Sequence, residues 1–263
     1  MTDWTTFEVE VGDGIGRVEL SRPELLNRFD MVLHRELTRV LTDLGGDDEV
    51  RAVVLLSTGR VFSAGGDTEV MLDASKSIAR RLSLIDEGRR LFRAVADFPK
   101  PLVVGLHANS YGLGTSLVLA ADAVVSAPDV EFSDPHVVMG LAAGDGGCVV
   151  WPSVMSMVRA KRHLLTGDPM TAEMAYQLGV VTDLVDTRDE VGPAAVALAL
   201  RMASLPPIAV QVTKRALNKV MMARADEVLD TSFYLEAITF GSEDLLEAVD
   251  AFKSKRAPEW KGN

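Results

Sequence analysis

The sequence predicts an α/β fold in which a mostly parallel sheet is followed by a helical C-terminal region. Short apolar runs that suit buried strands, at Ala52–Ser57, Leu102–Leu106 and Ala123–Ser126, alternate with stretches of helical periodicity. After Gly146-Gly147 the pattern is almost wholly helical. Strands that alternate with helices favour parallel pairing through right-handed crossovers. With 263 residues, 48% of them hydrophobic, the chain can bury a sizeable core.

The N-terminal part begins with two predicted strands, Phe7–Val11 and Ile15–Leu20, joined by a glycine-rich turn. Asp30 then precedes a helix, and a longer helical region with an irregular start is predicted over Thr68–Phe98. The apolar residues of the first helix recur at helical spacing: Leu33, Leu37, Val40, Leu41 and Leu44.

The C-terminal part is predicted as consecutive helices. Thr171 suits the cap of a helix that stops at Gly179, and Pro206-Pro207 separates two others. This pattern predicts a core domain over residues 1–204 and a helical region over residues 205–263.

Charge and composition exclude several classes of protein. The net charge of 27 − 38 = −11 repels nucleic acid and anionic lipid, so neither is an expected partner. No apolar run reaches the roughly 18 residues of a membrane span. The start, Met1-Thr2-Asp3-Trp4, lacks the features of a signal peptide, and the single cysteine, Cys148, excludes an intramolecular disulfide. These features predict a cytoplasmic protein.

Two strand-to-helix turns are rich in small residues, Phe62–Asp67 and Tyr111–Gly114. Glycines there let a ligand approach the backbone, and a helix N-terminus adds free N–H groups. Neither turn has the spacing of a phosphate-binding loop, and the glycines of residues 12–16 lie between two strands, which excludes a dinucleotide fingerprint. The alternative is that these glycines serve turn geometry alone.

A resemblance to the crotonase (enoyl-CoA hydratase/isomerase) superfamily extends over nearly the whole chain. Its motifs occur in order: Ser21-Arg22-Pro23-Glu24-Leu25-Leu26-Asn27, Phe62-Ser63-Ala64-Gly65-Gly66-Asp67, Lys100-Pro101, Leu164-Leu165-Thr166-Gly167, and Lys255-Arg256-Ala257-Pro258. The resemblance implies a spiral of ββα units with two roughly perpendicular sheets and a helical C-terminal region that forms trimers or pairs of trimers. It also implies an acyl-CoA thioester substrate, coenzyme A as part of that substrate, and no metal or other cofactor.

The same resemblance assigns ligand-binding positions. The backbone N–H groups of Gly66 and Leu113 would form an oxyanion hole, a pair of donors that stabilises an enolate oxygen. Coenzyme A would contact Leu25, Leu26, Ser63, Ala64 and Gly65, with Lys255 or Arg256 near its phosphates. Glu24 stands where many relatives have a basic residue, and the tail charges could instead be ordinary solvated groups.

The chain departs from the family at its acid–base positions. Both usual catalytic glutamates are absent: Ser116 stands at the first position and His136 at the second. His136 with Asp145, followed by Trp151-Pro152, is similar to the family's β-diketone (retro-Claisen) hydrolases of the 6-oxocamphor hydrolase type. Glu236 lies about where those hydrolases carry a further carboxylate, but Leu113 replaces their oxyanion-turn histidine.

Three functions therefore stay open. The first is an acyl-CoA hydratase or isomerase in which His136 and Asp145 form an altered acid–base set, with His136 as a base. The second is a cofactor-independent C–C hydrolase using His136, Asp145 and Glu236, and the third is a non-catalytic scaffold. Each residue also has a structural alternative: His136 as a loop histidine, Asp145 as a helix cap and Glu236 as a solvated helix residue. Structural roles are expected for Ser116, His107 and Cys148.

Overall fold

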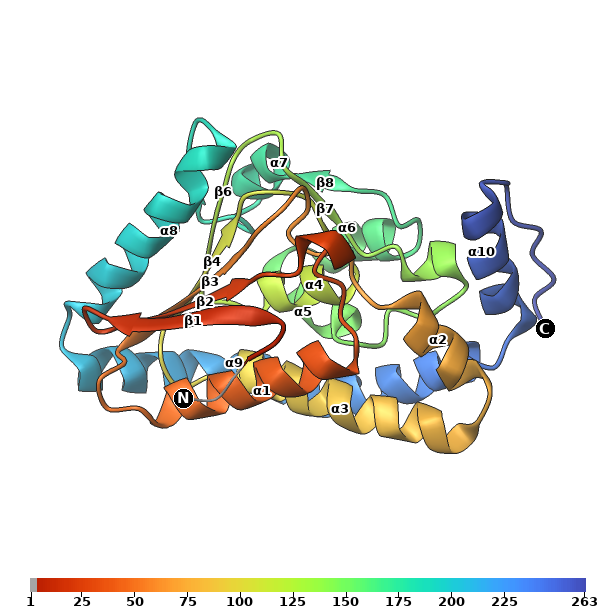
Figure 1. Ribbon diagram of the computed structural model, residues 1–263, viewed down its shortest axis with the longest axis horizontal. Coiled ribbons are helices and arrows are strands. Elements are labelled where there is room, and N and C mark those ends of the chain that lie inside the picture. The colour runs from red at the N-terminus through yellow and green to blue at the C-terminus, as the bar shows by residue number, and fades with distance from the viewer. Residues whose placement is uncertain (1–3) are drawn as a thin grey trace.

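A six-stranded sheet forms the centre of the molecule (Figure 1). A computed structural model describes residues 4–263, so the first three residues of the N-terminal segment considered above lie outside it. The strand order is β1-β2-β3-β4-β6-β9, in which β1 and β2 are antiparallel and every other neighbouring pair is parallel. The strands are β1 (Phe7–Gly12), β2 (Ile15–Leu20), β3 (Ala52–Ser57), β4 (Leu102–Leu106), β6 (Ala123–Ser126) and β9 (Asp183–Leu184).

Ten α-helices and two short 3₁₀-helices surround this sheet within residues 4–263. The α-helices are α1 (Met31–Gly46), α2 (Thr68–Ser75), α3 (Ile78–Ala96), α4 (Leu113–Leu119), α5 (Gly147–Val154), α6 (Met157–Leu164), α7 (Ala172–Gln177), α8 (Arg188–Ala203), α9 (Pro207–Thr239) and α10 (Glu243–Ser254). The 3₁₀-helices are η1 (Pro23–Leu25) and η2 (His136–Met139). The predicted α/β class with a helical C-terminal region is confirmed.

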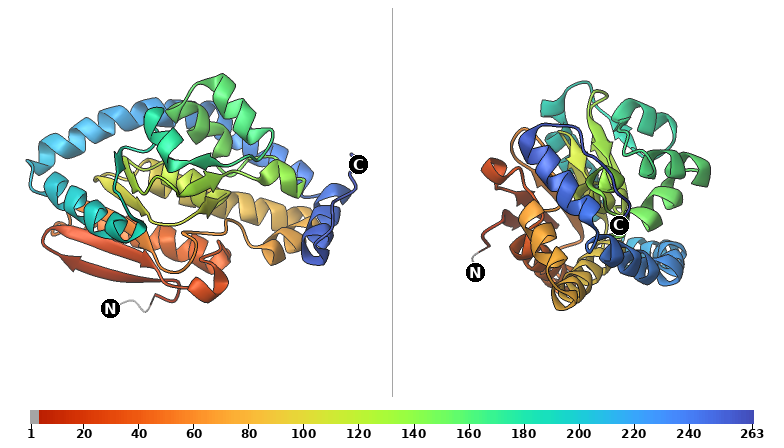
Figure 2. Two further views of the ribbon diagram at one scale, coloured as in Figure 1. Left: turned by 90° about the horizontal axis from the view of Figure 1, so that it is seen from above. Right: turned by 90° about the vertical axis from the view of Figure 1, so that its right-hand side faces the viewer.

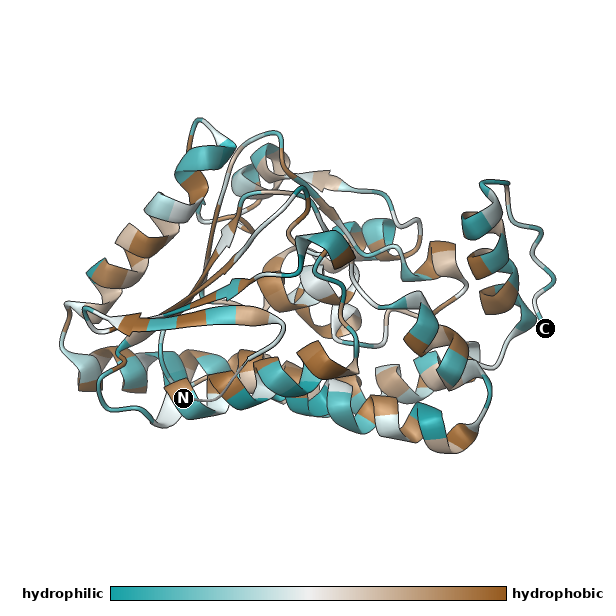
Figure 3. Ribbon diagram, viewed as in Figure 1, coloured by the Kyte–Doolittle hydropathy of each residue, from teal (hydrophilic) through white to brown (hydrophobic). Residues whose placement is uncertain are grey.

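The central strands are covered on both faces, which explains their continuous apolar sequences. Every residue of β3, β4 and β6 is buried. A Cβ on Gly16 would lie 3.1 Å from Leu44 of α1, and one on Gly105 would lie 3.2 Å from Ala195 of α8. Strand pairing puts these two glycines on opposite faces, so α1 and α8 pack on either side of the sheet (Figure 2). Helices α1 and α3 alternate hydrophobic and hydrophilic segments, as expected with one face buried (Figure 3).

A second, three-stranded sheet lies beside the ends of the first. It consists of β5 (Ser110–Tyr111), β7 (Glu131–Ser133) and β8 (Met170–Thr171), in the order β5-β7-β8. An isolated bridge between Ser63 and Ser110 joins the first glycine-rich turn to β5, whose Tyr111 begins the second turn, and another bridge joins Gly66 to Phe29. Neither the strands of this small sheet nor β9 was predicted from the sequence.

The C-terminal helices pack back onto the core. Ala225, Leu229 and Phe233 of α9 are buried in the main hydrophobic cluster, and α9 lies along α3 and α5. Helix α10 covers the end of the molecule where η2 and α2 lie (Figures 1 and 2). The predicted division at residue 204 falls between α8 and α9, and the predicted trimer stays a prediction. No single helix in residues 4–263 is long and apolar enough to cross a membrane; α8 and α9 reach that threshold only together, bent by 108°.

Candidate active site

A small cavity brings together most of the residues that the sequence singled out. It has a volume of about 50 Å³, and Gly66, Leu113, His136, Asp145 and Glu236 all line it. Its remaining wall is largely apolar and is formed by Phe29, Val70, Met71, Leu84, Ile85, Gly88, Phe233 and Phe240. A larger groove of about 550 Å³ shares Gly66, Met71 and His136 with this cavity. A long ligand in the groove could therefore present one end to the cavity.

The two glycine-rich turns meet at one wall of the cavity. Tyr111 N–H donates to the Ser63 carbonyl at 3.1 Å, and a Cβ on Gly65 would lie only 2.7 Å from the Tyr111 carbonyl oxygen. Gly65 has a φ of +81°, and Gly112, the cap of α4, has a φ of +51°. Glycine is suited to both positions because a side chain would be strained there.

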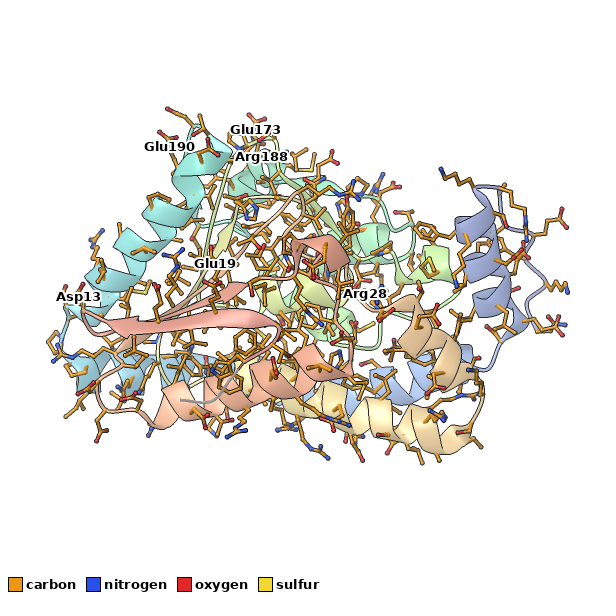
Figure 4. The ribbon with its side chains drawn as sticks, viewed as in Figure 1. Asp13, Glu19, Arg28, Glu173, Arg188 and Glu190 are labelled. Atoms are coloured by element: carbon orange, nitrogen blue, oxygen red, sulfur yellow. The ribbon has the colours of Figure 1, made fainter. Side chains whose placement is uncertain are left out.

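The Gly66 and Leu113 N–H groups have no acceptor among residues 4–263. The bridge to Phe29 uses the Gly65 carbonyl and the Asp67 N–H, which leaves the Gly66 N–H unused. Leu113 is the first residue of α4, so its N–H has no partner within that helix. The neighbouring Asp67 is held by an ion pair at 3.0 Å with Arg28, which is labelled in Figure 4. The oxyanion hole stays a prediction, and both of its donors line the cavity.

His136 lies between two carboxylates. Its Nδ1 contacts Asp134, and its Nε2 lies 3.2 Å from Asp145 Oδ2. The histidine is 7% exposed, and the Asp134 side chain is fully buried. The expected pairing of His136 with Asp145 is therefore present. Asp145 does not cap the following helix, because α5 begins at Gly147 and its N-cap residue is Gly146, with no side-chain cap.

The glycines around Asp145 make room for two other carboxyl groups. A Cβ on Gly144 would lie 2.5 Å from Glu236 Cβ, and one on Gly147 would lie 2.2 Å from Asp134 Oδ2. Ser232 of α9 also donates to the Gly144 carbonyl at 2.8 Å. Glu236 consequently approaches the cluster, with Oε1 3.9 Å from His136 Nε2, and it is buried rather than solvated.

Burial and charge shift two pKa values in this cluster. Burial is the largest influence on His136 and opposes its charged form, but Asp134 and Asp145 together raise its pKa well above the usual range. Burial also raises the pKa of Glu236 well above its usual range, and the nearby Asp145 acts in the same direction. At neutral pH the cluster therefore favours an imidazolium at His136 and a neutral carboxylic acid at Glu236. The predicted role of His136 as a base stays a prediction, but the direction of its shift favours a proton donor.

Three ligand-type groups of this cluster are close enough to hold a metal ion. Atoms of Asp134, His136 and Asp145 lie within 4.8 Å of one another. However, each ring nitrogen of His136 already contacts a carboxylate, so a metal would have to displace these contacts. The arrangement suits a hydrogen-bonded chain better than a metal centre, and the predicted absence of a metal stays a prediction.

The residues predicted to contact coenzyme A divide into two groups. Ala64 and Gly65 line the larger groove. Leu25 and Leu26 do not line it, and Ser63 is fully buried, with its hydroxyl donating to the Asn27 carbonyl at 2.9 Å.

The tail charges do not line the groove, although Phe252 of α10 does. Lys255 is exposed at the end of α10, and Arg256 is paired with Glu247 and Asp250. The assignment of these positions to coenzyme A stays a prediction.

The residues expected to be structural have identifiable contacts. Ser116 is buried, with its hydroxyl 3.5 Å from Asp145 Oδ1. His107 is at the surface, where its Nε2 lies 3.0 Å from the Gly59 carbonyl. Cys148 is a half-buried free thiol whose pKa is raised by burial, which disfavours a nucleophilic thiolate.

Two residues of the site were missed from the sequence. Asp134 precedes Pro135 and also accepts a 3.4 Å hydrogen bond from the His136 N–H, a local turn that the Asp-Pro pair could have indicated. His34 lies on the buried face of α1 and lines the cavity. Its position within an otherwise apolar helical stripe was the available signal.

Comparison with known proteins identifies the class to which this fold and site belong. Residues 10–263 match the model of the enoyl-CoA hydratase/isomerase family. The 1,2-epoxyphenylacetyl-CoA isomerase of Escherichia coli (strain K12) is 30% identical over 260 residues, covering 96% of this chain and 97% of the relative. The 2,3-dehydroadipyl-CoA hydratase of the same organism is 30% identical over 243 residues, covering 92% and 93%.

The solved structures agree. An enoyl-CoA hydratase/isomerase from Mycobacterium paratuberculosis has a TM-score of 0.89 and 34% identity, covering 95% of this chain and 99% of that one. The chain therefore belongs to the enoyl-CoA hydratase/isomerase, or crotonase, family, and the predicted crotonase-type fold is confirmed.

Proposed function

We propose that the protein catalyses proton transfer on an acyl-CoA thioester, as a hydratase or isomerase, with Asp145 and Glu236 in place of the usual glutamate pair. The observation that carries this proposal is that Asp145 and Glu236 line one small cavity with Gly66 and Leu113, whose N–H groups have no acceptor among residues 4–263. Family membership supports a thioester substrate, since relatives named for CoA-ester isomerisation and hydration match most of the chain.

The two carboxyl groups suit opposite roles. Asp145 lies 3.2 Å from Nε2 of His136 and lines the cavity, so it is assigned as the base. Glu236 is held protonated by burial and by the nearby negative charge, so it is the acid. Two titratable groups whose surroundings give them different protonation states are a common basis for paired acid–base catalysis.

A balanced cycle follows from this assignment. In isomerisation, Asp145 takes a proton from carbon, the electron pair moves to the thioester oxygen, and Gly66 and Leu113 donate to the resulting enolate. Glu236 then protonates a different carbon of the substrate. His136 restores the starting state by giving its Nε2 proton to Glu236 and taking one from Asp145. In hydration, Asp145 instead takes the proton of a water molecule whose oxygen adds to the β-carbon, and Glu236 protonates the α-carbon.

The test is Asp145→Asn, assayed on a panel of short enoyl-CoA esters. We expect kcat to fall by about 10²–10⁴-fold, the usual contribution of a positioned acid or base. Deuterium from solvent should enter the substrate carbons with the wild-type enzyme and should be lost with the variant. Asp48→Asn, the same change at an exposed position, is the control. Wild-type turnover by Asp145→Asn would overturn the proposal.

The C–C hydrolase alternative has weaker support. That reaction needs a neutral His136 to activate water, whereas both neighbouring carboxylates favour its protonated form. Cleavage of cyclic β-diketones together with inactivity on the CoA esters would favour the hydrolase instead. Inactivity on both the CoA esters and the cyclic β-diketones would favour a non-catalytic scaffold.

A further inference from the structure

His34 is a buried polar side chain in the apolar part of the cavity. It is 5% exposed, it lies on the inner face of α1, and it lines the cavity. Its ring meets the edge of Phe29 at a centroid distance of 5.9 Å and an interplanar angle of 71°. His34 belongs neither to the acid–base cluster nor to the two glycine-rich turns, so the proposed reaction does not use it.

The imidazole of His34 is neutral and lacks a protein partner. Burial lowers its pKa to about 4, although Asp145 and Glu87 act in the opposite direction. The ring therefore carries one N–H donor and one acceptor nitrogen at neutral pH. Its Nδ1 is buried with no hydrogen-bond partner in residues 4–263. A buried polar atom without a partner costs about 1–3 kcal/mol, so a partner supplied by a ligand would be stabilising.

The other polar side chain outside the acid–base cluster is already occupied. Asp67 lines the cavity, but its carboxylate forms the ion pair with Arg28 and accepts the Glu69 N–H at 3.0 Å. The surrounding wall presents carbon atoms from residues such as Val70, Ile85 and Phe240. An oxygen atom on a substrate bound here would therefore find its hydrogen-bond partner at His34.

The cavity is also small. A volume of about 50 Å³ holds only a few groups the size of water, which each need about 10–15 Å³ on this measure. A long alkyl chain does not fit this space without movement of the wall. The acyl group that reaches it is short.

We propose that His34 is a specificity-determining residue that hydrogen-bonds an uncharged oxygen, a hydroxyl or carbonyl, on a short acyl group bound in the cavity. The substrate class is then a short oxygenated acyl-CoA rather than a simple fatty acyl-CoA. This inference rests on the proposed function, because it takes the ligand to be an acyl-CoA thioester.

The test compares binding of 4-hydroxybutyryl-CoA and butyryl-CoA, two saturated esters that differ by one hydroxyl group, by calorimetry. We expect the wild-type protein to bind the hydroxylated ester at least about tenfold more tightly, since a buried polar group left without its hydrogen bond weakens binding. In His34→Leu the two affinities should come within about threefold. His34→Gln, which keeps a donor and an acceptor, should retain part of the preference. Val32→Ala, at an exposed position on the same helix, is the matched control.

The outcomes separate this inference from the function on which it rests. Equal binding of the two esters by the wild-type protein overturns the role of His34 and leaves the proposed function standing. A preference that persists in His34→Leu also overturns it, because another group must then contact the hydroxyl. Failure to bind either ester overturns the proposed function, and the inference falls with it. The wild-type comparison does not depend on the folding of any variant.

Discussion

The two reactive walls of the cavity differ in the kind of chemistry they use. One wall is formed by Gly66 and Leu113, whose N–H groups have no acceptor among residues 4–263; they come from two turns, each of which follows a buried parallel strand. The other presents the side chains of His136, Asp145 and Glu236 from η2, a loop and α9. The backbone wall depends on chain geometry, so the side-chain identity of Leu113 does not matter. The side-chain wall depends on each residue and can change while the fold persists.

The two walls also differ in the free energy that it costs to bury their polar or charged groups. Free N–H groups at a helix start are dipoles that the fold produces without burying a charge. The side chains of this wall form, with Asp134, a cluster of four ionisable groups, of which Asp134, His136 and Glu236 are buried, and these groups stabilise one another only as a set. Removing one member of a buried ionic network leaves the others unpaired, which is strongly destabilising. Changes to this wall should therefore alter pH dependence, whereas changes to the backbone wall should not.

After that of Asp145→Asn, the largest effect is expected at the backbone wall, from Gly65→Ala. The new Cβ would lie 2.7 Å from the Tyr111 carbonyl, at a φ of +81°, so the turn must shift and carry the Gly66 N–H with it. Loss of one oxyanion donor lowers kcat by about 10²–10³-fold. Steady-state kinetics on the best enoyl-CoA ester measures this effect, and the shape of the pH profile should stay the same.

The control for this variant is Gly46→Ala, because a Cβ there meets nothing within 4 Å. Circular dichroism should show that both variants remain folded. If Gly65→Ala turns over substrate as fast as the wild type, the Phe62–Asp67 turn takes no part in the mechanism.

The second effect is expected at the side-chain wall, from Asp134→Asn. Asp134 is one of two carboxylates that raise the pKa of His136, so its loss should lower that pKa. If the reaction needs the imidazolium, the alkaline limb of the kcat profile should move to lower pH, and kcat should fall more at pH 8 than at pH 6. If the alkaline limb stays at the same pH in Asp134→Asn, the titration of a group other than His136 causes it.

The contribution of the His136 ion pairs to the stability of the fold should also decrease as pH rises. Because the folded-state pKa of His136 is raised, its ion pairs stabilise the fold fully below the unfolded pKa, and this contribution disappears as pH rises through the folded pKa. The difference in Tm between wild type and Asp134→Asn should therefore be largest near pH 6 and should shrink toward pH 10. Thermal melts at several pH values measure it, and a difference that grows with pH would contradict the assignment.

The backbone wall was the more predictable from sequence. The apolar strand sequences and the glycines that follow them predicted β3, β4 and both turns. Asp30 caps α1 as expected, and its side chain accepts hydrogen bonds from the Val32 and Leu33 N–H groups. Such signals are local: periodicity and turn chemistry act within a few residues. The two-residue strands β5 and β8 carry no such signal, since a run that short has no periodicity.

The side-chain wall was only partly predictable. His136 and Asp145 could be paired by resemblance, but nine residues of separation fixed no distance between them. Asp134 was missed because its role depends on burial, and the neutral state of Glu236 depends on how α9 packs against the loop at Gly144. Protonation states arise from tertiary surroundings, which residue spacing does not encode.

The smallest effect is expected from Ser116→Ala. This change tests whether the residue at position 116 takes part in catalysis. Ser116 stands where the sequence resemblance predicts a catalytic glutamate, yet its hydroxyl lies 3.5 Å from Asp145 Oδ1, long for a hydrogen bond. If catalysis has moved to Asp145 and Glu236, removing this hydroxyl should change kcat by less than about threefold. Steady-state kinetics beside Asp145→Asn gives the comparison. A loss as large as that of Asp145→Asn would mean that Ser116 takes part in the chemistry together with Asp145 and Glu236.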